Sequence, residues 1–352
     1  MQCHARVAAV LLALGALAPA SAVAAPPAAP DPTAAPTPTS PASAPLPGGQ
    51  ITLRVRPAHG HGSHAFAGQR LVIAGSVAPY VPGQRVRVRV SLDYRHARIR
   101  TLSVMPAMGA TGRFRLSWLS RGTGVLRVAA THRASAAQGA FTARPVAVAL
   151  LDSVLGSGAR GPAVRLLQAQ LSRLHYALER SGTFDPATAR AVLAYRKVTR
   201  QSLHERTDLR LFELLARGAG TFRVRYPSHG KHLEADLSRQ VLAQIDRGGR
   251  VRLIYTMSSG KPSTPTVIGS FRVYSKTPGT NSVGMVDASY FIGGYAIHGY
   301  AEVPAYAASH GCLRIPIPNA ASMFAWLRVG DRVDVYNGSR GGSHRVSRHA
   351  GP

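Results

Sequence analysis

The sequence predicts a multidomain protein in which a β-sandwich and a small three-helix bundle precede a mainly-β C-terminal domain. The chain has 352 residues, which is more than one ordinary hydrophobic core accommodates. Apolar residues alternate with polar ones across residues 51–148, recur at helical spacing across 153–217, and alternate again across 219–337. We take these changes of period as the domain limits.

The N-terminus has the pattern of a secretory signal peptide. Arg6 precedes an apolar run over residues 7–18, and Ala22-Val23-Ala24 forms an A-x-A cleavage site. The run is too short to span a bilayer, so residues 1–24 are predicted to be removed, together with Cys3. We expect no integral membrane segment in the mature chain.

Residues 25–50 are rich in Pro and Ala and predict a stiff, extended linker. At the other end, residues 338–352 consist mostly of Gly, Ser, Arg and His and predict a disordered basic tail. Both segments would leave the folded parts free to reach a surface.

The net charge of the chain indicates what kind of partner the protein meets. Lys and Arg number 43 against 15 Asp and Glu, for a formal net charge of +28. Such a balance favours a polyanionic partner, although a GC-rich genome also enriches Arg, Ala and Gly. No dense basic block with interleaved aromatic residues occurs, so we expect no nucleic-acid groove and favour an acidic wall polymer.

Residues 51–148 show strand periodicity. Val86, Val88 and Val90 alternate with arginines, and turn signals such as Pro82-Gly83 separate similar runs. About seven short strands in about a hundred residues are typical of an immunoglobulin-like β-sandwich. Its outward arginines would make a basic face, suited either to wall binding or to passive spacing.

Three histidines in this region raise the question of a metal site. His59, His61 and His64 could each offer an imidazole ligand. No acidic or thiol ligand accompanies them, and the segment has the composition of a loop. We therefore expect no metal site.

Helical spacing begins after Pro162. Val164, Leu167, Leu171 and Leu174 lie on one face of a first helix. Asp185 and Pro186 predict the start of a second helix, and Thr207 is the expected cap of a third.

A family pattern runs through this helical region. It resembles the peptidoglycan-binding domain family in its glycines, apolar spacing and second-helix start: Gly158, Gly161, Val164, Leu167, Gln168, Leu171, Leu174, Tyr176, Gly182, Phe184, Thr188, Ala191 and Val192. The family usually continues with Phe-Gln, where this chain has Tyr195-Arg196. The resemblance implies a three-helix fold, and glycan binding or a structural remnant of it.

The C-terminal region returns to short β segments. Strands are predicted at 223–225, 232–237, 250–255, 270–274, 290–292 and 332–336, with one helix at 319–327. Between them lies the strongest chemical signal of the chain, a cysteine with histidines nearby.

Cys312 is the candidate nucleophile. A neighbouring imidazole can take the proton of a thiol and then stabilise the thiolate. His298, at the end of a strand-like run, and His310, two residues from the thiol, compete as this base, and local sequence does not choose between them. Gly311 permits a tight turn that could aim amides at an oxyanion, and Arg314 could bind a carboxylate.

These residues form a paired signature. His298-Gly299 followed by Ser309-His310-Gly311-Cys312-x-Arg314 resembles the L,D-transpeptidase catalytic domain, the YkuD-like family. Asp236-Leu237-Ser238-x-Gln240 and Thr264-Pro265…Gly269-x-Phe271 resemble its other motifs. Together with the helical region, the resemblance covers about half of the chain.

The resemblance implies residue roles. Cys312 would accept the acyl group, and His298 would be its general base, oriented by the backbone carbonyl of Gly299. His310 and the amides of Gly311 and Cys312 would line an oxyanion hole. Ser309 and Arg314 would hold the loop or the substrate.

It also implies a function. The thiolate would attack a peptidoglycan tetrapeptide stem, release D-Ala, and pass the acyl group to an amine of another stem in a 3→3 cross-link. Water as acceptor would give an L,D-carboxypeptidase, and the sequence also leaves room for a non-catalytic peptidoglycan-binding protein or an extracellular thiol peptidase. We expect no cofactor, peptidoglycan stems and glycan as partners, a monomer, acylation by carbapenems, and a secreted, wall-associated location.

Overall fold

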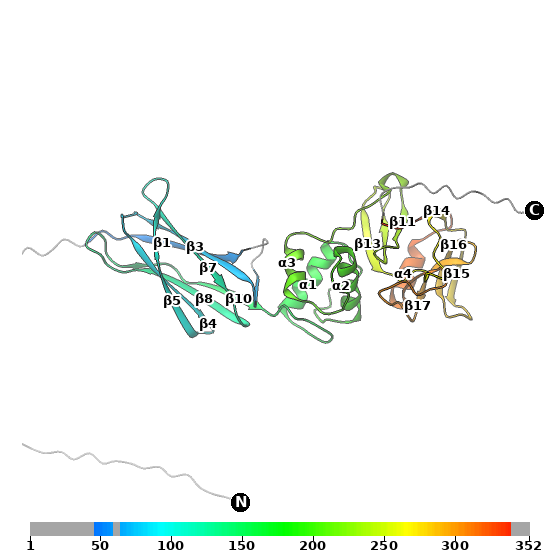
Figure 1. The fold of residues 1–352 in the computed structure, drawn as a ribbon, viewed down its shortest axis with the longest axis horizontal. Helices are drawn as coiled ribbons and strands as arrows, with labels where there is room; N and C mark the ends of the chain where they lie inside the picture. Colours follow the sequence, from blue (N-terminus) through cyan, green and yellow to red (C-terminus); the bar gives the residue numbers. More distant parts are fainter. Residues whose placement is uncertain (1–45, 59–63, 339–352) are drawn as a thin grey trace, which may run out of the picture. The chain divides into compact units, whose positions relative to one another are not determined.

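The computed structural model describes residues 46–58 and 64–338, and Figure 1 labels its helices and strands. The predicted signal peptide, all of the linker before residue 46, His59, His61 and the tail after residue 338 lie outside the described residues. Within the described ranges, no helix combines the length and the apolar character that crossing a bilayer requires.

The N-terminal region is built of strands. Their bounds are β1 (Gln50–Pro57), β2 (Ala65–Phe66), β3 (Arg70–Ala78), β4 (Arg85–Leu92), β5 (Arg95–Ser103), β6 (Met105–Pro106), β7 (Gly112–Leu119), β8 (Gly124–His132), β9 (Phe141–Thr142) and β10 (Val146–Leu151).

These strands form two sheets with one core between them. The first has the order β1-β3-β7-β6, and the second has the order β2-β10-β8-β4-β5, with β9 beside β8. Val86, Val88 and Val90 are buried in the core that both sheets share, while the alternating Arg85 and Arg89 are exposed. The alternation in the sequence is therefore confirmed, and the immunoglobulin-like type stays a prediction.

The helical region contains α1 (Pro162–Arg173), α2 (Pro186–Thr199) and α3 (Leu209–Ala216). Asp185 caps α2 as predicted, because its carboxylate accepts the amide hydrogen of Thr188 at 2.7 Å. The predicted cap of the third helix is wrong. Asp208 caps α3, whereas the hydroxyl of Thr207 bonds to the backbone of Ser153 and Leu155.

The C-terminal region is mainly β. Its elements are β11 (His232–Asp236), β12 (Val241–Ile245), β13 (Val251–Thr256), β14 (Gly269–Arg272), β15 (Ser275–Thr280), β16 (Val286–Ile292), β17 (Tyr295–Tyr300), β18 (Leu313–Pro316), α4 (Ile317–Trp326) and β19 (Arg332–Tyr336), with a short 3-10 turn, η1 (Pro227–His229).

The predicted strand at residues 223–225 is wrong. The amides of Arg225 and Tyr226 donate to the buried carboxylate of Glu234 at 2.7–3.0 Å, so side-chain acceptors replace a neighbouring strand. Helix α4 begins two residues earlier than the sequence predicts and ends one residue earlier.

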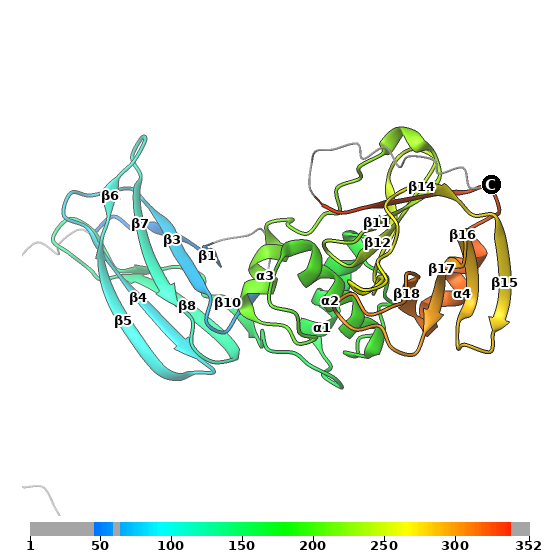
Figure 2. The ribbon, with the colours of Figure 1, turned by 45° about the vertical axis from the view of Figure 1, so that its right-hand side comes forward.

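Two sheets and α4 enclose the core of this region. The sheets have the orders β13-β12-β11-β19-β14 and β15-β16-β17-β18. Met323 of α4 packs with buried residues of both sheets, including Leu233 and Leu313. Figure 2 shows α4 beside β16, β17 and β18, with which it makes its contacts.

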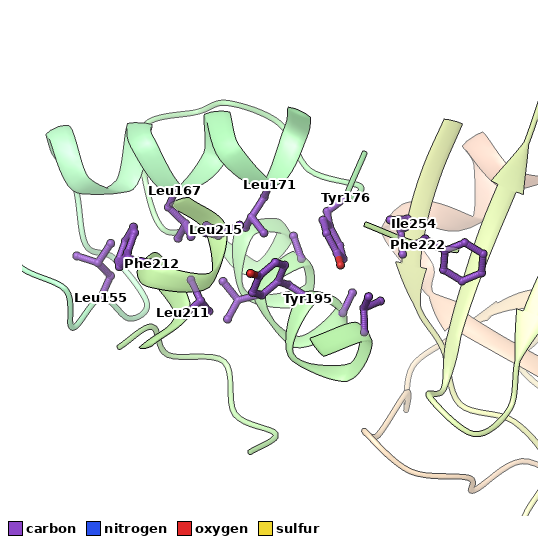
Figure 3. Packing of buried hydrophobic residues seen from close by; sticks show 14 of the residues in the cluster. Leu155, Leu167, Leu171, Tyr176, Tyr195, Leu211, Phe212, Leu215, Phe222 and Ile254 are labelled. Carbon is purple, nitrogen blue, oxygen red and sulfur yellow. The ribbon is translucent and has the colours of Figure 1, made fainter. Parts of the chain in front are cut away.

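The helical region and the β12–β13 hairpin share a second hydrophobic core. Leu167, Leu171 and Tyr195 belong to the same buried cluster as Ala243 and Ile254. Figure 3 shows the helix side chains converging, with Tyr176 and Ile254 facing each other.

Backbone pairing adds to this contact. The amide of Ile254 donates to His175 at 2.7 Å, and the amide of Ala177 donates to Ile254 at 2.9 Å. Residues 175–177 therefore cover the edge of β13 that would otherwise be unpaired.

Candidate active site

Parallel pairing of β17 and β18 brings the predicted nucleophile and base together. Cys312 immediately precedes β18, and in the register His298 lies opposite Arg314. Since side chains alternate along a strand, Cys312 and Arg314 share one face of β18, on the same side of the sheet as His298. His298 lies within β17, which continues two residues beyond it, whereas the sequence suggested that the strand ends there.

These side chains line a cavity of about 360 Å³. Its walls are Val283, Met285, His298, Tyr300, Ser309, His310, Cys312 and Arg314. A larger cavity, of about 600 Å³, lies in the N-terminal sheets, but no thiol or carboxylate lines it. We therefore place the candidate active site at the smaller cavity.

His298 is held as a neutral imidazole. Its Nδ1 lies 2.9 Å from the carbonyl oxygen of Gly299. Because a carbonyl only accepts, Nδ1 carries the hydrogen and Nε2 keeps its lone pair. Burial lowers the pKa of His298, the charge of Arg314 lowers it further, and the bond to Gly299 opposes both effects.

Cys312 rests as a thiol. Burial raises the pKa of Cys312, while a hydrogen bond from the backbone of Ala296 and the charge of Arg314 oppose that rise. The thiol donates to the carbonyl of Gly294 across 3.8 Å. With both pKa values shifted toward the neutral forms, the thiolate is expected to form as the reaction begins rather than as a standing ion pair.

A hydrogen-bonded loop fixes the position of Cys312. The hydroxyl of Ser309, which is fully buried, donates to the carbonyl of Cys312 at 2.6 Å and accepts the amide of Gly311 at 3.0 Å. Gly311 has φ +121°, and a Cβ there would lie 2.2 Å from the ring of Tyr295. The loop therefore depends on a glycine at this position.

The amide of Gly311 does not fit its expected role. The resemblance assigned it to an oxyanion hole, yet in this structure its hydrogen already bonds to Ser309. Ser309 correspondingly acts on the loop, which is the first of the two roles expected of it.

His310 is exposed at the rim of the cavity. Its Nε2 lies 3.2 Å from the ammonium of Lys261, and since an ammonium only donates, Nε2 is the acceptor. That nitrogen is therefore occupied, which favours His298 over His310 as the base.

Arg314 presents a cation to the cavity. Its guanidinium lies 4.0 Å above the ring of Tyr300, and within residues 46–58 and 64–338 it forms no ion pair. Such a group can bind a carboxylate or stabilise a developing negative charge. Tyr300 was not among the residues predicted from the sequence, and its position two residues after His298 on one strand face was the available signal.

Two further supports of the loop were also missed. The hydroxyl of Thr266 donates to the carbonyl of Gly311 at 2.8 Å and accepts the amide of Gly260. The carbonyl of Ser259 accepts the amides of Ala308 and Ser309 at 2.8 and 2.9 Å. Thr266 directly follows the Thr-Pro motif, but a hydroxyl in a loop gives no sequence signal of its partner.

Two family models match the chain. Residues 230–335 match the L,D-transpeptidase catalytic domain, and residues 160–199 match the peptidoglycan binding domain. No curated protein matches.

Solved structures give further similarity. An L,D-transpeptidase from Xylanimonas cellulosilytica is 33% identical, with 52% of this chain and 98% of that one covered and a TM-score of 0.48. A mutant of the Enterococcus faecium L,D-transpeptidase is 27% identical over 30% of this chain and 50% of that one, with a TM-score of 0.27.

The family matches thus define a peptidoglycan-modifying enzyme of the transpeptidase class. The chain contains an L,D-transpeptidase catalytic domain, with a peptidoglycan-binding domain upstream of it.

Proposed function

We propose that the protein is an exported L,D-transpeptidase that forms 3→3 cross-links in peptidoglycan. The observation that carries this proposal is the pairing of Cys312 with a neutral, Gly299-oriented His298 in one cavity. Family membership supplies the substrate class, and the guanidinium of Arg314 suits a stem carboxylate.

The residues present account for each step of acyl transfer. Nε2 of His298 takes the thiol proton as Sγ of Cys312 attacks the carbonyl carbon of the third stem residue. The same nitrogen then returns the proton to the amine of the departing D-Ala, leaving a thioester. An amine of a second stem attacks this thioester, gives its proton to His298, and displaces the thiolate of Cys312, which then takes that proton back from His298.

Arg314 has two electrostatic effects at this step. Its charge lowers the pKa of Cys312, which favours the thiolate, and lowers the pKa of His298, which disfavours the imidazolium. The proton therefore returns readily to the leaving amine, as acid catalysis of that departure requires.

The N-terminal half suits a protein that works at the wall. We infer that residues 1–24 direct export, and that the linker and an immunoglobulin-like sandwich space the enzyme from the surface. The exposed arginines on β4 support attraction to an anionic polymer.

The test uses purified protein and disaccharide-tetrapeptide muropeptides, with the products identified by mass spectrometry. We expect dimers linked between the third residues of two stems, and none with Cys312→Ala. Trimmed monomers alone would show water as the acceptor and hence a carboxypeptidase. Dimers formed by Cys312→Ala would refute the assigned nucleophile.

A further inference from the structure

Lys197 is a buried cation of the helical region whose bonds all lie in the catalytic domain. It is on α2, inside the segment that matches the peptidoglycan-binding model, and is 4% exposed. Its ammonium donates to the carbonyl of Gln240 at 3.1 Å, the hydroxyl of Thr256 at 2.7 Å and the carbonyl of Met257 at 3.0 Å. An ammonium has three N–H groups, so this set uses all of them.

The partners of Lys197 lead to the nucleophile loop. The side chain of Gln240 accepts the amide of Ser259 at 2.8 Å and donates to its hydroxyl at 2.7 Å. Ser259 in turn accepts the amides of Ala308 and Ser309, and Ser309 holds the backbone of Cys312. A series of hydrogen-bonded residues thus joins α2 to the backbone of Cys312.

A second connection runs beside the first. Met257, whose carbonyl binds Lys197, is followed by Ser258, which exchanges two backbone hydrogen bonds with Arg314 at 2.9 and 3.0 Å. Lys197 therefore supports both ends of the segment that carries Cys312 and Arg314.

Stability alone gives no reason for a lysine at this place. Among the residues that the structure describes, no carboxylate bonds to its ammonium, and burial lowers the pKa of Lys197 to about 7. A buried charge that lacks a counter-ion costs free energy that a hydrophobic side chain of similar length would avoid. What the ammonium adds is geometric, because it fixes three acceptors around one point.

We propose that Lys197 is a positioning residue for the Cys312 loop, so that α2 of the peptidoglycan-binding region forms part of the support of the catalytic centre. This inference rests on the acyl-transfer function proposed above. The helical region accordingly sets how fast Cys312 reacts, in addition to any role in binding glycan.

The test measures acylation of Cys312 by a carbapenem in the full chain, followed by intact mass and by the loss of β-lactam absorbance. Lys197→Met is expected to lower the maximal acylation rate by about 10- to 100-fold, as for a small misplacement of a reacting group. The half-saturating drug concentration should stay unchanged, since Lys197 does not line the cavity. The melting temperature should change little, because removal of an unpaired buried charge offsets the loss of three hydrogen bonds.

Arg196→Met is the matched control. Arg196 is the neighbouring buried cation on α2, but it bonds to Arg206, Gln201 and Asp208 within the helical region. This variant should lower the melting temperature and leave the acylation rate unchanged. Equal slowing by both variants would mean that any disturbance of α2 suffices, which would overturn the specific role of Lys197.

A second variant covers the case in which Lys197→Met does not fold. Thr256→Val removes one of the three acceptors at constant volume and should also slow acylation at an unchanged half-saturating concentration. Wild-type rates in Lys197→Met, or in Thr256→Val if the first is unfolded, would overturn the inference. Failure of the wild-type protein to form any adduct would instead refute the proposed function.

Discussion

Gly311 offers a sharp test of how the loop controls the thiol. In Gly311→Ala the new methyl group would lie 2.2 Å from Cε1 and 2.7 Å from Cδ1 of Tyr295, well inside any tolerated contact. The backbone would also keep φ +121°, which costs a side-chain-bearing residue about 1–3 kcal/mol. Relief of the clash adds about 1–3 kcal/mol, so we expect a loss of about 2–6 kcal/mol in unfolding free energy.

The expected effect on activity follows from the size of the clash. Either the ring or the loop must shift by about 1 Å, and a misplacement of that size costs about 100-fold in rate. Urea denaturation would measure the unfolding free energy, and the reaction with a carbapenem would measure the rate at which Cys312 is acylated. An acylation rate equal to that of the wild type would show that the geometry of this loop does not control the reactivity of Cys312.

Two further variants separate the cost of the positive φ from the cost of the clash with Tyr295. Gly279 has φ +75°, but nothing lies within 4 Å of the position that a methyl group would occupy there, so Gly279→Ala should show the backbone cost of about 1–2 kcal/mol and unchanged acylation. Adding Tyr295→Ala to Gly311→Ala removes the ring that the methyl group meets. The double variant should lose less than the sum of the two single losses, and simple additivity would contradict the packing explanation.

The remaining predictions concern charge and capping. Alkylation of Cys312 by iodoacetamide should reach half of its maximal rate at a higher pH in the folded protein than in the urea-unfolded chain, because burial raises the pKa of that thiol; an equal or lower midpoint in the folded protein would contradict this. His298→Ala should abolish the carbapenem adduct seen by intact mass, whereas an undiminished adduct would return His310 to the role of base. Since the pKa of His298 is lowered from 6.5, the unfolded chain takes up its proton first, so this residue's contribution to unfolding free energy should fall as the pH drops below 6.5. Urea titrations of the wild type and His298→Gln at pH 5 and 7.5 would show this as a smaller pH effect in the variant. Asp185→Ala should cost about 0.5–2 kcal/mol by loss of the α2 cap, and Asp185→Asn, which keeps the acceptor, should cost less.

Local patterns were enough to predict much of the fold. The spacing of Leu167 and Leu171 and the Asp185-Pro186 pair predicted α1 and the start of α2, because helix periodicity and capping act within a few residues. The prediction of a strand at 223–225 failed because Glu234, more distant in sequence, accepts the amides of Arg225 and Tyr226 at its end. The prediction that Thr207 caps the third helix failed for a similar reason, since its hydroxyl bonds to the backbone of Ser153 and Leu155, which precede α1.

The candidate site likewise combines features that local sequence predicts with features that depend on distant residues. The sequence around Cys312 predicted the nucleophile, but local sequence did not decide between His298 and His310 as its base. The register of β17 against β18 supplies what spacing alone lacks, since it sets His298 opposite Arg314. Lys197 gave no signal because a helical lysine is usually solvated, and its three acceptors belong to another domain.

The pairing of residues 175–177 with β13 affects whether the catalytic domain can be separated from the helical region. A catalytic domain expressed alone from residue 219 would present a bare strand edge beside an apolar face that includes Ala243 and Ile254. Exposed edges of this kind recruit other chains and lead to aggregation. We therefore expect a transfer of the catalytic domain to another protein to give a soluble product only when the helical region accompanies it.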